Sequence, residues 1–316
     1  MGEIPWRFKS SHPHKRFYEV RGYRGTAYDD RPPVRLDAFA DSSIRRATPY
    51  PSRMILSDSE VAISAAEAGS VVLRDWYGKP LSHFAKSSTD FATEADLESE
   101  RAILTVIAAA RPADALVGEE SGHTGRSNRT WLVDPLCGTL NYAAETCAFA
   151  VNVALQIDNR VEVSAVADPL SGDVYWSDGL AAYIRRGGAD QPVHPDSRSK
   201  LVDIDLYYPP DAEGKLRVVG LLTEPGFMQR FQPRATGTTL ATTWVASGRR
   251  AGYLTDGPAF GSVHFAAGVA ICQAAGCIVT DFRGDRLNAE STGLVVAADR
   301  TTHEYLVAMV QSFLDP

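Results

Sequence analysis

The sequence has no apolar run long enough to cross a membrane, and its first residues lack the apolar core of a signal peptide. It also has no CxxC pair and no cluster of cysteine and histidine with zinc-site spacing. The four cysteines are Cys137, Cys147, Cys272 and Cys277, and the last two fall in an apolar stretch typical of buried thiols. These absences predict a soluble protein of the reducing cytoplasm.

An excess of basic residues is missing as well. The 316 residues include 32 Lys and Arg against 39 Asp and Glu, which gives a formal net charge of −7. Nucleic-acid-binding domains favour a basic surface, so the composition predicts no nucleic-acid partner, and no membrane partner is expected either. The hydrophobic share of 44% is ordinary for a globular chain that buries a sizeable core.

The chain divides in two by composition. Residues 1–55 are rich in Arg, Pro, Asp and Tyr and show no clear period, which predicts an N-terminal arm that is extended or partly disordered. Its aromatic residues leave open an arm that covers a site or wraps a partner subunit. Residues 56–316 predict one folded domain, with a metal- and phosphate-binding half over 56–200 that carries an antiparallel sheet and a second α/β half over 201–316.

Helical and strand patterns alternate along this domain, which predicts a mixed α/β fold built in layers. Helical spacing falls over 57–78, 96–111, the first parts of 235–254 and 265–285, and 303–314. Strand patterns fall over 115–121, 130–136, 147–159, 160–179, 181–188, 216–222, 292–299, and the last parts of 235–254 and 265–285.

Three acidic segments stand at the ends of these elements. They are Asp90–Asp96 (DFATEAD), Gly118–Ser121 (GEES) and Asp134–Thr139 (DPLCGT). Carboxylates clustered at strand ends repel one another unless a cation compensates them, and hard oxygen ligands of this kind suit Mg²⁺. One such segment alone is as easily a solvated turn, but three in succession indicate a magnesium site.

Taken in order, these segments resemble the motifs of the inositol monophosphatase family. DFATEAD is similar to the family's D-x-V-T-x-x-D, VDPLCGTLNY to its D-P-[IL]-D-G-T-x-N-[FY], and HFAAGVAICQAAG to its W-D-x-A-A-G…E-A-G-G. The resemblance runs from about Ser57 to the C-terminus. It implies a layered α-β-α-β-α fold of the inositol monophosphatase and fructose-bisphosphatase type, a homodimer, and Mg²⁺-dependent hydrolysis of a small phosphorylated or polyol-like substrate.

The resemblance also implies roles for the matching residues. Glu119, Asp134 and the carbonyl of Leu136 would hold the first Mg²⁺. Asp96 would lie in an outer shell or at a third ion. Thr139 with Glu119 would orient and deprotonate the attacking water.

Substrate contacts follow from the same turn. The backbone N–H groups of Gly138 and Thr139, at a helix N-terminus, would bind the phosphate. Asp256, in LTDGPAFG, precedes the third motif and is a candidate to line the pocket, although a turn role fits it equally well.

Two positions depart from the family pattern. Cys137 replaces the second aspartate of D-P-x-D-G-T, and Phe265 replaces the aspartate of W-D, with His264 in place of the tryptophan. In the family these two aspartates bind a second Mg²⁺ together with the residue that is Asp134 here. A thiolate is a soft, poor ligand for Mg²⁺ and phenylalanine offers none. We therefore expect the second ion to be lost, which leaves one Mg²⁺ or no ion.

Cys137 and His264 admit two interpretations. Both stand where the lost ion was held, so we expect them to lie close together, and the helix N-terminus beside Cys137 is expected to lower the pKa of its thiol. Such a pair can act as a nucleophile and base, or as an acid and base. Alternatively, Cys137 fills space against Phe265, and packing replaces the ion.

Three functions fit these residues. The first is hydrolysis of a sugar-, cyclitol- or nucleoside-phosphate with a reduced metal set. The second is non-hydrolytic chemistry, as in a lyase, cyclase or transferase of a specialised biosynthetic pathway, with Cys137, His264 and the retained carboxylates as acid–base groups. The third is a non-catalytic pseudo-phosphatase. Retention of Glu119, Asp134 and Thr139 favours an enzyme.

Overall fold

The structure is a computed structural model that describes residues 56–86, 91–206 and 217–313. All of these residues belong to one compact unit of the chain. The arm predicted over residues 1–55 and Asp90 of the first acidic segment lie outside the described residues. Within the described residues, no helix is long and apolar enough to cross a membrane.

An eight-stranded sheet occupies the first half of the described chain. Its strands are β3 (Ala115–Gly118), β4 (Gly122–Thr124), β5 (Arg129–Cys137), β6 (Ala150–Ile157), β7 (Arg160–Asp168), β8 (Asp173–Ser177), β9 (Ala182–Arg186) and β10 (Ala189–Pro192). They lie in the order β10-β9-β8-β7-β6-β5-β3-β4, and only β3 and β5 run parallel. The turn residues of the sequence close the hairpins, since the carboxylates of Asp168 and Asp178 each accept two backbone N–H groups of the following turn.

A five-stranded sheet follows. Its strands are β11 (Leu201–Asp205), β12 (Gln232–Thr236), β13 (Gly252–Thr255), β14 (Ile278–Thr280) and β15 (Leu294–Ala297). In the order β12-β11-β13-β15-β14, β11 runs parallel to both neighbours, and β15 runs antiparallel to both of its own. A separate hairpin pairs β1 (His83–Ala85) with β2 (Phe91–Thr93).

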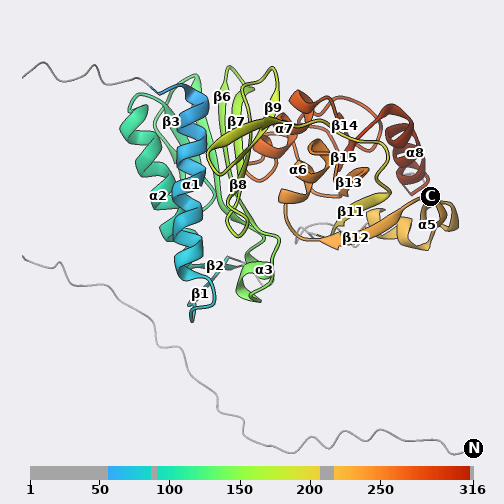
Figure 1. Ribbon diagram of the computed structural model, residues 1–316, viewed down its shortest axis with the longest axis horizontal. Coiled ribbons are helices and arrows are strands. Elements are labelled where there is room, and N and C mark those ends of the chain that lie inside the picture. The colour runs from blue at the N-terminus through green and yellow to red at the C-terminus, as the bar shows by residue number, and fades with distance from the viewer. Residues whose placement is uncertain (1–55, 87–90, 207–216, 314–316) are drawn as a thin grey trace, which may run out of the picture. The chain divides into compact units, whose positions relative to one another are not determined.

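Helices complete the layers (Figure 1). They are α1 (Asp58–Trp76), α2 (Glu94–Ala110), α3 (Thr139–Ala143), α4 (Arg217–Gly220), α5 (Pro225–Arg230), α6 (Leu240–Ala246), α7 (Ala266–Ala275) and α8 (Arg300–Gln311), with a 3₁₀ turn over Leu221–Thr223. α1 and α2 cover one face of the eight-stranded sheet, α6 and α7 lie between the two sheets, and α4, α5 and α8 cover the far side of the five-stranded sheet. The predicted α/β fold with α-β-α-β-α layers is confirmed.

Strand β5 connects two of the three hydrophobic cores. Successive side chains of a strand point to opposite faces. Accordingly, Trp131 and Val133 pack in the core beneath α1 and α2, whereas Leu132 packs in the core that contains α6 and α7. The register of β5 against β6 then shifts between Asp134 and Cys137, so the strand ends in an irregular turn between the two sheets.

Helices α6 and α7 approach each other closely. A Cβ added at Gly268 would lie 2.3 Å from Thr242 Oγ1, so only glycine allows this spacing. α7 ends at Gly276, whose φ of 95° is the left-handed conformation common after a helix. The predicted helix and glycine stop over this segment are therefore both present.

The strand predicted over 216–222 is wrong. The described part of this segment forms α4 and the 3₁₀ turn, with Val218 and Leu221 buried on one side at helical spacing. The carboxylate of Asp256 accepts a hydrogen bond from Val218 N–H, at 3.0 Å. A residue distant in sequence thus supports a short helix that its β-branched composition disfavours.

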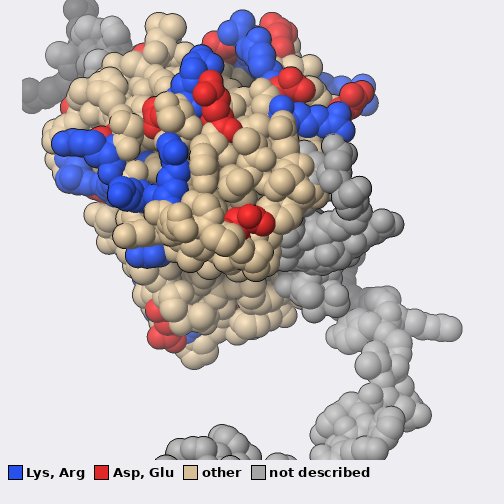
Figure 2. Space-filling view, turned by 90° about the vertical axis from the view of Figure 1, so that its right-hand side faces the viewer, with Lys and Arg blue, Asp and Glu red and all other residues tan. Residues whose placement is uncertain are grey.

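The outer surface carries charge unevenly. Figure 2 shows one face, on which basic side chains gather in separate groups toward its left and upper parts, with acidic side chains among the upper groups. The centre of this face is mostly uncharged.

Candidate metal and catalytic site

Asp134 is the centre of the site. Its side chain is fully buried, and its two oxygens have different partners. Oδ1 accepts a hydrogen bond from Leu136 N–H, at 3.1 Å, whereas Oδ2 accepts one from Asn152 Nδ2, at 3.2 Å, and lies 2.8 Å from His264 Nδ1. Burial opposes the charge on Asp134, but the neighbouring His264 outweighs it and holds the pKa of the carboxyl below its ordinary value.

Glu119 joins Asp134 because β3 and β5 run side by side. Its backbone N–H donates to Val133 O, at 3.0 Å, which fixes the turn after β3 against β5. Glu100, from α2, supports the same turn by accepting hydrogen bonds from the N–H groups of Glu120 and Ser121, each at 2.8 Å. The sequence offered no signal for this role of Glu100.

Lys86 forms ion pairs with Glu119 and with its neighbour Glu120. Its Nζ lies 2.7 Å from Glu119 Oε1 and 2.5 Å from Glu120 Oε1. Burial opposes the charge of this ammonium, but the two carboxylates raise its pKa above the ordinary value. This contact could not be predicted from the sequence, because Lys86 belongs to none of the motifs.

Charges within the cluster shift one another. Burial, with the nearby charge of Asp134, raises the pKa of Glu119. Burial alone would lower the pKa of His264, but the charge and hydrogen bond of Asp134 raise it to about 9. The two carboxyl groups of the cluster therefore shift in opposite directions, with the pKa of Glu119 raised and that of Asp134 lowered.

Thr139 and Asp96 form a second polar pair beside the turn. The Thr139 hydroxyl lies 3.2 Å from Asp96 Oδ1 and 3.1 Å from Leu136 O. Asp96 is fully buried and accepts hydrogen bonds on Oδ2 from both N–H and Oγ1 of Thr93, yet burial raises its pKa to about 6. The structure thus places the Thr139 hydroxyl on Asp96.

Gly138 makes the turn possible. Its φ is 102°, and an added Cβ would lie 3.0 Å from Ala148 O and 3.1 Å from Gly237 O. Only glycine fits these requirements, and α3 begins directly after it.

Cys137 lies in a different environment from the one that the sequence predicted. Its Sγ accepts hydrogen bonds from Thr239 N–H, at 3.2 Å, and Thr239 Oγ1, at 3.0 Å. Burial, followed by the charge of Asp134, raises the pKa of the thiol well above its ordinary value, so the expected lowering is wrong. The helix-end argument failed because it neglected burial, which favours the neutral thiol.

His264 and Cys137 bond to different partners, so the described contacts do not pair them. Cys137 and Phe265 instead belong to the same buried core, with Phe265 only 6% exposed. Asn152 links the two sides of the turn, since its Nδ2 lies 3.2 Å from Asp134 Oδ2 and 3.0 Å from Thr239 Oγ1.

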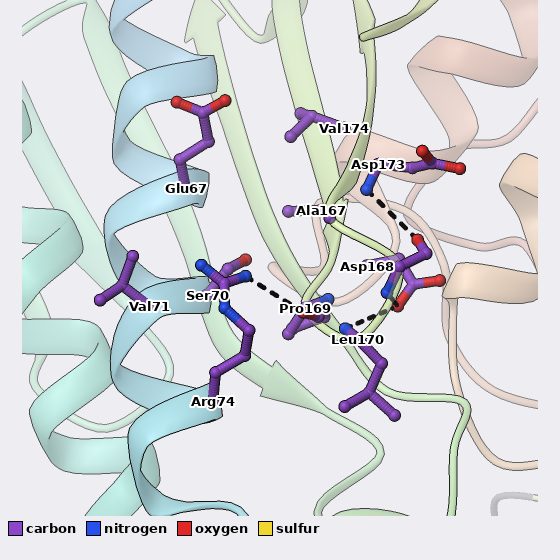
Figure 3. Close-up of a pocket in the computed structure, with 12 residues that line it drawn as sticks. Glu67, Ser70, Val71, Arg74, Ala167, Asp168, Pro169, Leu170, Asp173 and Val174 are labelled. Atoms are coloured by element: carbon purple, nitrogen blue, oxygen red, sulfur yellow. Dashed lines mark hydrogen bonds between the residues drawn. The ribbon is translucent and has the colours of Figure 1, made fainter. Parts of the chain in front are cut away.

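Asp256, the remaining candidate for substrate binding, has an oxygen on the backbone of Val218. This contact favours the turn role that the sequence left open. A separate surface pocket, between α1 and the turn from β7 to β8, contains none of the site residues (Figure 3). Its polar groups serve the turn, with Arg74 Nη1 donating to Pro169 O at 3.1 Å.

The donor atoms fit one divalent ion. Glu119, Asp134 and His264 each offer a ligand atom, and these atoms all lie within 4.8 Å of one another. The carbonyl of Leu136 lies on the same turn. The position of the family's second ion does not fit, because a neutral buried thiol and an apolar ring stand where two carboxylates are needed.

Comparisons with known proteins agree with the motifs. The model of the inositol monophosphatase family matches residues 57–314, and the chain belongs to this family. A relative named Nus factor SuhB, from Salmonella typhimurium, is 30% identical over 265 residues, covering 80% of this chain and 96% of the relative. An inositol-1-monophosphatase of Caulobacter vibrioides is 27% identical, covering 72% of this chain and 90% of the relative.

Solved structures show the same fold. The extragenic suppressor protein SuhB of Bartonella henselae superposes with a TM-score of 0.71 at 23% identity, covering 80% of this chain and 97% of that one. An IMPase of Thermotoga maritima gives a TM-score of 0.70 at 22% identity, covering 81% and 97%.

Proposed function

We propose that the protein hydrolyses a small phosphomonoester of a sugar, cyclitol or nucleoside, using one divalent ion held by Glu119, Asp134 and the carbonyl of Leu136. One observation carries the proposal: carboxylate oxygens of Glu119 and Asp134 and a nitrogen of His264 lie within 4.8 Å of one another, and Thr139, on the same turn as Asp134, donates a hydrogen bond to Asp96. The family includes phosphatases, and Mg²⁺ is their usual ion.

The residues around the turn would have separate roles in the reaction. When bound, the ion would polarise the phosphoryl group and stabilise its developing charge. The Thr139 hydroxyl, held by Asp96, would orient the attacking water, and Glu119 would accept its proton. The N–H groups of Gly138 and Thr139 would bind phosphate oxygens. Asp256 stays a weaker candidate for a substrate contact.

Phosphate release tests the proposal. Wild-type protein and Glu119→Gln are compared on a panel of sugar, cyclitol and nucleoside monophosphates, with Mg²⁺, Mn²⁺ or Zn²⁺. Because Glu119 both binds the ion and takes the proton, we expect the substitution to cost roughly a hundredfold or more in kcat. Glu304→Gln, at an exposed position of α8, is the matched control and should keep full activity.

Two alternatives have their own support. The hydrogen-bonded His264 and Asp134 favour acid–base chemistry without hydrolysis, although the buried, neutral Cys137 does not favour a nucleophilic thiol. The relatives named Nus factor favour a role without turnover. A wild-type chain that binds the ion but releases phosphate from none of the panel would reject the hydrolase in favour of one of these. Homodimer formation, expected from the family, is tested by light scattering on the same protein.

A further inference from the structure

His264 directs a nitrogen at the two retained carboxylates. Its Nδ1 lies 2.8 Å from Asp134 Oδ2 and 3.9 Å from Glu119 Oε2. Two ligand atoms about 2.1 Å from one ion lie about 3.0 Å apart at a right angle and about 3.4 Å apart at the tetrahedral angle. The two observed separations bracket these values, and all three atoms lie within 4.8 Å of one another, so side-chain shifts would let one ion reach all three.

The other oxygens of both carboxylates already have partners. Asp134 Oδ1 accepts from Leu136 N–H, and Glu119 Oε1 accepts from Lys86 Nζ. Asn152 Nδ2 additionally donates to Asp134 Oδ2. Outer donors of this kind hold metal-binding side chains in place, and here they leave Oε2 of Glu119 and Oδ2 of Asp134 on the side of His264.

His264 and its neighbour Phe265 lie in different surroundings. The ring of Phe265 is buried in the core around α7, and His264 N–H donates to Ser262 Oγ at 3.2 Å. The two side chains thus separate, with Phe265 in the core and His264 beside Asp134.

We propose that His264 Nδ1 is a third side-chain ligand of the ion bound by Glu119 and Asp134, and that this site takes a borderline first-row ion such as Zn²⁺ in preference to Mg²⁺. Oxygen-only sets suit Mg²⁺, whereas an imidazole nitrogen suits Zn²⁺. Catalytic zinc sites have three protein side-chain ligands, the number that Glu119, Asp134 and His264 would supply, and the carbonyl of Leu136 would add a further oxygen. The inference rests on the proposed function only for the shared ligands, Glu119 and Asp134.

Metal binding tests the selectivity without any turnover. Competition titrations give Kd for Zn²⁺ and Mg²⁺ in wild type, His264→Gln and His264→Trp, the last of which restores the family's residue. We expect wild type to prefer Zn²⁺, and each variant to lose at least the roughly 10–100-fold in Zn²⁺ affinity that outer-shell changes cost. Affinity for Mg²⁺ should change little. His194→Gln, at an exposed histidine, is the control.

Spectroscopy tests the ligand directly. With Mn²⁺ as a paramagnetic probe, electron spin-echo modulation should show coupling to an imidazole ¹⁴N in wild type and none in His264→Gln. Absence of this coupling in wild type, or an unchanged ratio of Zn²⁺ to Mg²⁺ affinity in both variants, would overturn the inference. Nitrogen ligation without phosphate release under any ion would reject only the proposed function, and Mg²⁺-driven hydrolysis without nitrogen coupling would reject only the inference.

Discussion

The two ends of one short turn differ in what surrounds them. Asp134 keeps a charged side chain that bonds to Leu136, Asn152 and His264. Three residues later, Cys137 lies in a hydrophobic core and accepts hydrogen bonds from Thr239. Both ends are buried, but Asp134 has polar and charged neighbours, whereas Cys137 packs mainly among apolar side chains.

The difference follows from where each residue lies in the fold. Cys137 and Phe265 belong to one packed core. Asp134 lies on β5, and Glu119 follows β3, which pairs directly with β5. The pairing of β3 with β5 therefore brings Glu119 and Asp134 together independently of the core around Cys137.

Placing carboxylates at both positions 137 and 265 should have the largest effect on stability. Cys137→Asp/Phe265→Asp places two charges in a core, so without Mg²⁺ we expect the free energy of unfolding to fall by at least about 3 kcal/mol. If the second site forms, Mg²⁺ at about 100 times its Kd should return about 2.7 kcal/mol. Urea unfolding with and without Mg²⁺ measures both changes, beside wild type under the same conditions. Calorimetry that finds two Mg²⁺ ions in wild type would contradict the loss of this site.

Replacing Asp96 should change the free energy of unfolding by nearly the same amount, and this change should depend on pH. Burial raises its pKa from 3.8 to about 6, so the stability that it contributes is fully present below about pH 4 and is lost as pH rises through about 6. At about 1.4 kcal/mol per pKa unit, Asp96→Asn should gain up to roughly 3 kcal/mol relative to wild type between pH 4 and pH 7. Unfolding with a chelator present measures this gain. Asp75→Asn, at an exposed position of α1, should show no such trend, and a flat difference for Asp96→Asn would contradict the expectation.

Cys137→Ser should have the smallest effect of the three changes on stability and on activity. A serine hydroxyl still accepts hydrogen bonds from Thr239, so we expect a loss of about 1 kcal/mol and a kcat within a few-fold of wild type. Cys272→Ser, at another buried cysteine whose Sγ donates to Thr242 O, is the matched control. If Cys137→Ser folds but loses turnover, whereas Cys272→Ser does not, the thiol of Cys137 would have a catalytic role.

Sequence motifs predicted the parts of the site that are local in the chain. GEES and DPLCGT each combine a strand end with a tight turn, so their geometry follows from a few consecutive residues. Lys86, Glu100 and Asn152 were not predicted, because each reaches the site from another element and belongs to no motif. Their contacts depend on how β1, α2 and β6 pack.

The burial of side chains also could not be predicted from the motifs. The wrong pKa direction for Cys137 and the wrong strand over 216–222 both came from local arguments. Burial, with the charge of Asp134, raises the pKa of the Cys137 thiol, and Asp256, distant in sequence, accepts a hydrogen bond from Val218 N–H in the short helix. Strand β11 was missed for a related reason, since its buried Asp203 and Asp205 interrupt the apolar pattern of LVDID.

Strand β5, with side chains in two cores, has a consequence for motion at the site. Its backbone cannot open without disturbing both cores, so amide hydrogen exchange near Val133 should require unfolding of the whole unit. Lys86 follows the short, exposed strand β1 and is held by its ion pairs with Glu119 and Glu120 rather than by a hydrophobic core. We therefore expect the backbone at Asp134 to stay fixed. If the site adjusts to ligands of different size, we expect Lys86 and the residues around it to move.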